Sequence, residues 1–306
     1  MTDFPLPAAH LRVTDEVAEA LRRGQPIVAL ETTIVVHGLP APVNLEVALA
    51  CEAAVRSSGA VPATIGVLDG VVQVGMSQED VAQLADPERG AIKLSARDLG
   101  VALSRGVSGA TTVAGTIAVA HRVGISVMAT GGLGGVHRGA SETFDESADL
   151  TTLSRTPVLV IASGVKSILD IGATLERLDT LGVPVWGYRC DSFPAFYRSE
   201  SDFGVEWRFE RPEEVARAFA RHREWSSTGA LLAHPVASDR QLDESVHSDA
   251  LARALDRAAA TGVTGKAVTP AVLSAFAELT GGQSVVVNQD LVVANAALAG
   301  AVAAAS

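Results

Sequence analysis

A glycine-rich loop followed by acidic residues is the part of this sequence best suited to chemistry. The stretch from Ala129 to Leu150 reads ATGGLGGVHRGASETFDESADL, with five glycines between Gly131 and Gly139. Glycines prevent a regular element there and let backbone N–H groups close on a ligand without interference from a Cβ atom. The loop also supplies a set of side chains suited to binding an anion, holding a hard cation and moving protons: His137, Arg138, Asp145, Glu146 and Asp149.

A carboxylate and an amine follow two apolar segments elsewhere in the chain. Pro26 to Leu30 (PIVAL) predicts a short strand that ends at Glu31, where α/β proteins place their sites; an edge salt bridge explains the same carboxylate. Lys166 follows a near-continuous apolar run, Pro157 to Ser163, and we expect it in the first turn of a helix. A helix N-terminus and partial burial would favour a neutral, nucleophilic amine. An ordinary surface lysine is the alternative.

Three further segments offer groups that could bind a ligand. AIKLSARDLG places Lys93 on a predicted strand, although a lone lysine is usually a solvated charge. Gly109 to Val123 predicts a helix opened by Thr111 and Thr112, whose free N–H groups could hold a phosphate. Near the end of the chain, Lys266 and Asn288 stand beside predicted helix starts.

The elements that must position these residues alternate between short β-branched runs and alanine-rich helical patterns. An Asp69-Gly70 pair predicts a hairpin turn, and Ser77 with Asp80 predicts a capped helix start. The alternation continues to two or three closing helices without a long linker or repeat. We therefore expect one domain over residues 1–306, an α/β protein with three α/β/α layers and a mostly parallel central sheet.

Composition limits the possible partners and compartments. The chain has 306 residues, 48% of them hydrophobic, and a net charge of −11, which disfavours nucleic acid or an anionic membrane surface as the main partner. Two cysteines give neither a metal-binding spacing nor a disulfide framework. The N-terminal residues lack the apolar core of a signal peptide, so we expect a cytoplasmic protein.

Several longer strings resemble one enzyme family over most of the chain. They are ALETTIVVHGLPAPVNLEVA, KLSARDL, ATTVAGTIAVAHRVGI, MATGGLGGVHRGASETFDESADL, SGVKSILDIGATLERLDTLGVPVWGY and GKAVTPAVL. Together they strongly resemble the pseudouridine-5′-phosphate glycosidases, from about Ile27 to Asn295. The resemblance implies reversible cleavage of the C–C glycosidic bond of pseudouridine 5′-phosphate to ribose 5-phosphate and uracil. It also implies a divalent metal, usually manganese, and a homotrimer of α/β/α subunits.

The resemblance carries residue roles with it. Glu31 matches the family's proton donor and Lys166 its nucleophile, while Asp145 matches the metal-binding aspartate. The substrate contacts that it implies are Lys93, Val113, Ser147, Ala148 and Asp149. To these we add, from their residue types, His137 and Arg138 around the phosphate with Lys93, and Asn288 as a further substrate contact.

The reaction makes sense of these residue types. A C–C bond offers no leaving-group oxygen to protonate, so the carboxylate pair of ordinary glycosidases is insufficient. We hypothesise that Glu31 assists opening of the ribose ring while the Lys166 amine bonds to C1′, giving an imine after uracil departs. An oxygen ligand such as Asp145 suits manganese or magnesium rather than zinc.

Four positions depart from the family pattern. Glu146 replaces an apolar residue after the metal aspartate, and could tighten cation binding or face solvent. His234 stands where the family has an asparagine, Ala271 where it has a phenylalanine, and Gln289 where an apolar residue is common. These changes concern the nucleobase more than the lysine chemistry. Two other functions stay open: a Schiff-base aldolase or lyase acting on another sugar phosphate, and a non-catalytic sugar-phosphate-binding protein.

Overall fold

A large, mostly parallel sheet forms the centre of the molecule in the computed structural model, which describes residues 10–263 and 268–306. Its strands follow the short β-branched runs of the sequence, and the central ones are buried on both faces, as helices on both sides of a parallel sheet require. The strands of this sheet are β1 (Leu11–Val13), β2 (Ile27–Leu30), β3 (Val61–Leu68), β4 (Val71–Val74), β5 (Ile92–Leu94), β6 (Gly109–Thr111), β7 (Val127–Ala129), β9 (Leu159–Ala162), β11 (Val185–Tyr188), β12 (Trp207–Phe209) and β13 (Ala230–Ala233).

Strand order brings distant segments of the chain side by side. The order is β1-β4-β3-β2-β7-β9-β13-β11-β12, and β6 pairs with β3 and β5. From β3 to β12 along this order, neighbouring strands are parallel. The residues that follow β2, β7, β9 and β13 therefore gather at one edge of the sheet. A separate antiparallel pair joins β8 (Val136–His137) to β10 (Leu169–Asp170).

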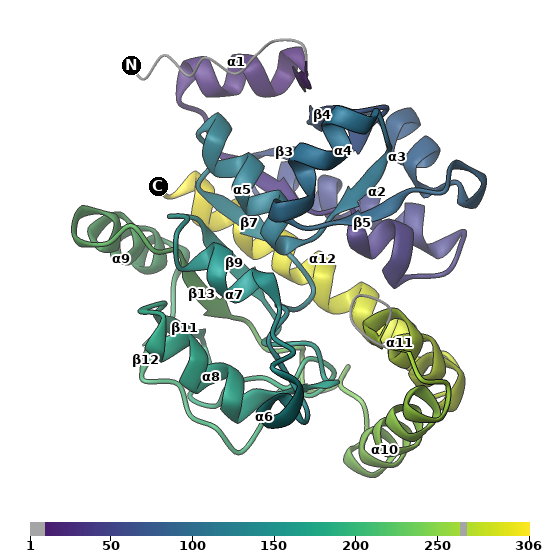
Figure 1. Cartoon of the computed structure of the whole chain (residues 1–306). Coiled ribbons are helices and arrows are strands. Elements are labelled where there is room, and N and C mark those ends of the chain that lie inside the picture. Colours follow the sequence, from purple (N-terminus) through teal and green to yellow (C-terminus); the bar gives the residue numbers. More distant parts are fainter. Residues whose placement is uncertain (1–9, 264–267) are drawn as a thin grey trace.

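Helices cover both faces of the sheet (Figure 1). They are α1 (Asp15–Arg23), α2 (Val43–Ser57), α3 (Gln78–Ala85), α4 (Leu99–Arg105), α5 (Val113–Val123), α6 (Ala140–Thr143), α7 (Ala148–Leu153), α8 (Ile171–Thr180), α9 (Pro212–Trp225), α10 (Glu244–Ala260), α11 (Val268–Leu279) and α12 (Gln283–Ala304). Helices α2, α9 and α12 pack together behind the strands, and α5 with α7 packs in front. The helices thus complete the three α/β/α layers expected from the sequence, and the expected single domain over the whole chain stays a prediction.

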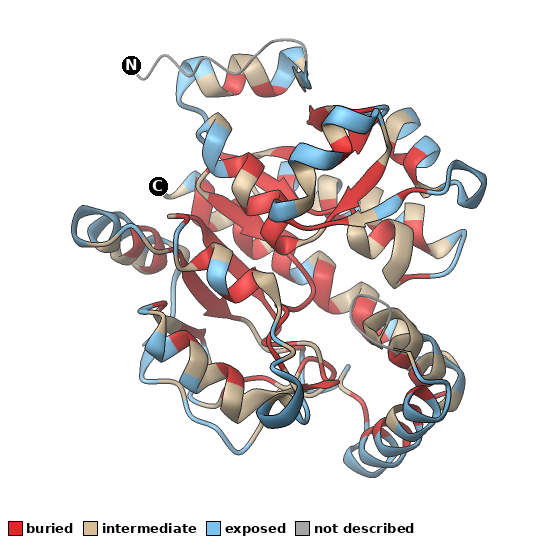
Figure 2. Cartoon of the chain, viewed as in Figure 1, coloured by how far each residue is buried: buried red, intermediate tan, exposed pale blue. Residues whose placement is uncertain are grey.

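Helix α12 is the central support of the rear layer. It is long and apolar enough to span a membrane by composition alone, yet 56% of its most apolar window is buried inside the protein. It packs against α2 and against β2, β7 and β9, and Figure 2 shows it red along the sheet. Gly300 permits close packing on α2, because a Cβ there would lie 3.0 Å from the Val55 carbonyl oxygen. We therefore describe it as a core helix.

Local signals in the sequence predicted several elements well. The hairpin turn at Asp69 and Gly70 joins β3 to β4, with both residues at positive φ, and Ser77 with Asp80 forms the expected capping box of α3. One helix start was wrong. Residues 109–111 are strand β6, so α5 begins only at Val113 with Thr112 as its N-cap. The pairing of β6 with β3 and β5 outweighs the helical pattern there.

Candidate functional site

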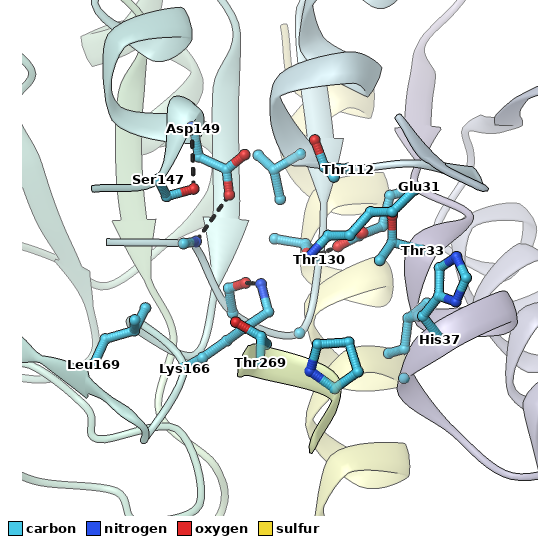
Figure 3. A pocket seen from close by; sticks show the side chains of 18 of the residues that line it. Glu31, Thr33, His37, Thr112, Thr130, Ser147, Asp149, Lys166, Leu169 and Thr269 are labelled. Carbon is cyan, nitrogen blue, oxygen red and sulfur yellow. Dashed lines mark hydrogen bonds between the residues drawn. The ribbon is translucent and has the colours of Figure 1, made fainter. Parts of the chain in front are cut away.

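A pocket of about 190 Å³ lies at the sheet edge where β2, β7 and β9 end. Glu31 follows β2 and Thr130 follows β7, and both line this pocket. Figure 3 shows Asp149 and Ser147 on one side, His37 on the opposite side, and Thr130 between them. The site occupies the position at which open α/β sheets bind ligands.

Glu31 is a buried acid that lines the pocket. The residue is 9% exposed, and its carboxylate accepts a short hydrogen bond from the Thr130 hydroxyl. Burial raises the pKa of Glu31, while the Lys166 ammonium, the Thr130 hydrogen bond and Lys93 act to lower it and Asp149 acts to raise it. The net result is a carboxyl group that holds its proton more tightly than a solvated glutamate. Such a group is suited to general acid catalysis near neutral pH.

Lys166 lies on a loop between β9 and β10, and the prediction that it stands in the first turn of a helix was wrong. Helix α8 begins at Ile171, capped by the Asp170 side chain. The helix dipole therefore gives no reason for a neutral amine at Lys166. Instead, its backbone N–H donates to the Leu133 carbonyl at 3.1 Å, and its Nζ donates to the Gly132 carbonyl at 2.6 Å. The glycine loop thus directs the amine into the pocket.

Asp149 fixes the glycine loop from inside the protein. Its two carboxylate oxygens accept hydrogen bonds from the backbone N–H groups of Ala114 and Gly134, each at 2.9 Å. A Cβ at Gly134 would lie 2.6 Å from the Asp149 carboxylate and 2.3 Å from the Ser147 hydroxyl. Only glycine permits this approach. Asp149 therefore lines the pocket while joining the loop to the start of α5, and the Ala114 N–H is no longer available to a phosphate.

Asp145 and His137 form the most polar wall. The two side chains lie 3.9 Å apart, between His137 Nδ1 and Asp145 Oδ2. Burial lowers the pKa of His137, Asp145 opposes this, and Lys93 and Lys166 lower it further. The next residue, Glu146, forms an ion pair with Arg177, with 2.8 Å between Arg177 Nε and Glu146 Oε2. Its carboxylate is therefore already paired with a guanidinium group.

The donor set around Asp145 fits a hydrated hard cation. Within residues 10–263 and 268–306, no cluster of three or more histidine, cysteine or acidic side chains is placed to hold a metal. The Asp145 side chain is 39% exposed, which leaves room for water ligands. Magnesium and manganese accept a single carboxylate with several waters more readily than zinc does.

Two further cationic side chains line the pocket. Lys93 on β5 and Arg97, four residues later, both line it, together with Thr112 at the start of α5. Arg138 does not line the pocket and is exposed. The structure therefore places Lys93, Arg97 and His137, rather than Arg138, around the available space.

Three buried polar atoms of pocket residues have no hydrogen-bond partner within the part of the chain that the structure describes: His37 Nε2, Ser95 Oγ and Asn288 Oδ1. Such atoms are rare in proteins and often await a ligand or water. His37 belongs to a π-helical turn, Ile34–Gly38, a feature frequent at functional sites. Sequence reasoning included Asn288 but missed Ser95 and Thr130, although both adjoin segments that it had singled out.

The structure brings nearly all of the predicted site residues into one pocket. Those that line it are Glu31, Lys93, Val113, His137, Asp145, Ser147, Ala148, Asp149, Lys166 and Asn288. Lys266 lies outside the described residues. A buried carboxyl group, a lysine amine and cationic side chains thus face the same space, an arrangement suited to covalent chemistry on an anionic substrate.

Comparison with known proteins gives one consistent family. A family model described as "Indigoidine synthase A like protein" matches residues 16–305. The pseudouridine-5′-phosphate glycosidase of Salinispora tropica is 53% identical over 97% of this chain and 92% of its own length. That of Herpetosiphon aurantiacus is 48% identical over 96% of this chain and 97% of its own.

Two solved structures of related proteins have the same fold as this chain. The prealnumycin C-glycosynthase AlnA, crystallised with ribulose 5-phosphate, is 40% identical, with a TM-score of 0.89 over 98% of this chain and 97% of its own. An indigoidine synthase A-like protein from Thermotoga maritima is 34% identical, with a TM-score of 0.87 over 96% of each chain.

Proposed function

The chain belongs to the indigoidine synthase A-like family that contains the pseudouridine-5′-phosphate glycosidases, and from this premise we propose that it cleaves pseudouridine 5′-phosphate to uracil and ribose 5-phosphate. The observation that supports this proposal most strongly is the pairing of a buried acid, Glu31, with an amine, Lys166, in one pocket. Neither an ordinary glycosidase nor a simple binding protein needs that combination.

The first step opens the ribose ring. After the Lys166 ammonium loses a proton to solvent, its amine attacks C1′, the C1′–O4′ bond breaks, and O4′ takes the proton that Glu31 holds. The raised pKa of Glu31 increases the fraction of this carboxyl group that carries the proton. The resulting Glu31 carboxylate then takes the excess proton from the new C1′ ammonium, so the nitrogen regains a lone pair.

The second step breaks the C–C bond. Glu31, protonated again by the preceding step, transfers its proton to C5 of uracil. The nitrogen lone pair forms the C1′=N bond of a protonated imine, and the C1′–C5 electrons remain with uracil, which leaves as a neutral base. Water then hydrolyses the imine, releasing ribose 5-phosphate and the free lysine. The reverse sequence joins the same two molecules, so the enzyme is competent in both directions.

The cationic side chains that line the pocket suit the phosphate of the substrate. Lys93 and Arg97 supply positive charge there, and the Thr112 hydroxyl adds a hydrogen-bonding group. When bound, a divalent cation such as Mn²⁺ or Mg²⁺ supplies positive charge against the phosphate or sugar oxygens. Asp145 would hold this cation, while Glu146 beside it is paired with Arg177.

A second sugar-phosphate reaction is the main rival. AlnA has been crystallised with ribulose 5-phosphate, so a related pocket accepts a pentose phosphate of different structure. A Schiff-base aldolase or lyase would keep the Lys166 chemistry without releasing uracil. We therefore propose incubation with pseudouridine 5′-phosphate and Mn²⁺, with free uracil and ribose 5-phosphate followed by chromatography. Absence of uracil while Lys166 is modified by a pentose phosphate would favour the rival.

A further inference from the structure

A row of hydrogen-bonded side chains crosses the sheet edge behind the pocket. Each of four adjacent parallel strands, β2, β7, β9 and β13, is followed at once by a polar residue. These residues are Glu31, Thr130, Ser163 and His234. Because neighbouring parallel strands end at the same edge, the four side chains stand in one line.

Asn295 of α12 connects three of the four. It is fully buried, and its Nδ2 donates to the Thr130 carbonyl oxygen at 2.9 Å and to Ser163 Oγ at 3.1 Å. Its Oδ1 lies 2.9 Å from Nδ1 of His234. Asn295 stands two helical turns beyond Asn288 on α12, so one face of this helix serves both the pocket and the row behind it.

The hydrogen bonds fix the orientation of the amide. A backbone carbonyl can only accept, so the nitrogen of Asn295 must face Thr130 and its oxygen must face His234. His234 Nδ1 therefore carries a hydrogen and donates it to Asn295 Oδ1. This donation persists whether or not the imidazole is protonated, because Nδ1 bears a hydrogen in both states.

We propose, building on the proposed function, that Asn295 and His234 are positioning residues that orient Thr130 and thereby the hydroxyl that donates to Glu31. Asn295 holds the Thr130–Gly131 peptide, and the same Thr130 residue contacts the acid. Sequence resemblance places an asparagine where this chain has His234. An asparagine and a histidine at this position can each donate an N–H to Asn295, so His234 supplies the same hydrogen bond from a different side chain.

The row is expected to influence the pKa of Glu31. The charged groups that act on this carboxyl are Lys166 from the β9–β10 loop, Lys93 from β5 and Asp149 from α7, and the Thr130 hydroxyl adds a hydrogen bond that lowers the pKa. Burial raises the pKa of Glu31, and loss of the Thr130 hydrogen bond would remove one of the interactions that lower it. The pKa of Glu31 would then rise further.

Three variants test this proposal. His234→Phe keeps a ring but removes the donor, and His234→Asn restores an N–H in the form common in the family. His222→Phe is the matched control, because His222 also packs against aromatic rings, but its ring nitrogen bonds Thr228 instead of Asn295. Each variant is measured for kcat, KM and the pH dependence of uracil release.

We expect His234→Phe to lower kcat about tenfold with KM nearly unchanged, as loss of one buried hydrogen bond in a catalytic network does. Its basic pH limb, which reports the protonated Glu31, should move up by about one unit. His234→Asn should restore kcat and return the basic limb of the pH profile to its original position. The basic limb of His222→Phe should match that of the unmodified protein. An unmoved limb in His234→Phe, or equal defects in both His234 variants, would overturn the proposal.

A substrate-free measurement separates this proposal from the proposed function. The Glu31 carboxyl can be titrated by ¹³C NMR, with its resonance assigned by its loss in Glu31→Gln. Thr130→Val, which lacks the hydroxyl, and His234→Phe should both raise this pKa. If they do so in a protein that releases no uracil, the positioning role stands and the proposed function fails. If the pKa is unchanged in both variants, the positioning role fails by itself.

Discussion

Glu31 shows how burial changes the acid–base properties of a single residue. The apolar strand that precedes it places the carboxyl at the sheet edge, and the protein around it raises the pKa. The same burial imposes a thermodynamic cost on ionisation. A group with a raised folded-state pKa destabilises the fold once the pH exceeds its unfolded value.

We therefore expect Glu31→Gln to make the protein more stable at neutral pH. The destabilisation is absent below the ordinary glutamate value of 4.5 and complete above the raised folded-state pKa. Denaturant unfolding of both proteins across this range measures the difference. The stability gain of Glu31→Gln should grow with pH and vanish near pH 4.5. A gain that shrank as pH rose would show that the folded-state pKa is lowered instead.

Asp145 and Glu146 are adjacent carboxylates with different surroundings. Glu146 is paired with Arg177, whereas the ion-pair contact of Asp145 within the described residues is the longer one to His137. We expect Asp145→Asn to weaken Mn²⁺ activation at least tenfold, because it removes the charged oxygen that a hard cation prefers. Glu146→Gln, the matched control, should change it by less than about threefold, since an exposed ion pair contributes little. Titration of activity with Mn²⁺ distinguishes them, and equal losses would contradict the role of Asp145.

The glycine loop is the element on which the site depends most. We expect Gly134→Ala to raise KM at least tenfold, because its Cβ would displace the Asp149 carboxylate and the Ser147 hydroxyl. Gly139→Ala in the same loop is the control. No atom lies within 4 Å of its Cβ, and its φ of +77° costs only about 1 kcal/mol of stability. Steady-state kinetics and thermal unfolding check both variants. A similar KM in the two variants would show that the close approach at Gly134 is unimportant.

The local elements show what sequence could and could not predict. Glu31 was placed correctly because an apolar run followed by a carboxylate identifies a strand end. Lys166 was misplaced because the left-handed turn at Gly164 (φ +78°) and the bridge between Leu133 and Val165 keep the chain out of a helix just after β9. The signal for the true helix start was Asp170, whose side chain accepts from the Ala173 N–H at 3.0 Å. An N-cap four residues after the lysine was the better guide.

At the scale of the whole molecule, the site depends on contacts between distant segments. Asn295 lies 165 residues from Thr130, which it bonds, and no local pattern near either residue reveals the pair. The fold class was predictable because alternation of strand and helix patterns is a property of the entire chain. The row of side chains behind the pocket was not predictable from the sequence, because strand order determines which side chains become neighbours.

Assembly is a further property of the whole molecule that resemblance to the family predicts. We expect a homotrimer, and therefore a solution mass three times the 31.5 kDa of one chain. Light scattering coupled to size-exclusion chromatography measures this mass directly. A mass of one chain at micromolar protein concentration would contradict the expectation.

The central claim, a covalent bond between Lys166 and the sugar, has an unusually clean test in this chain. Only three lysines occur in the sequence, at positions 93, 166 and 266. Incubation with pseudouridine 5′-phosphate and Mn²⁺ in the presence of borohydride would reduce an imine to a stable secondary amine, and peptide mass spectrometry would locate it. We predict a ribose-phosphate adduct on Lys166, release of one uracil per adduct, and loss of both adduct and turnover in Lys166→Met. Full uracil release without an adduct on Lys166, or near-normal turnover by Lys166→Met, would contradict the account.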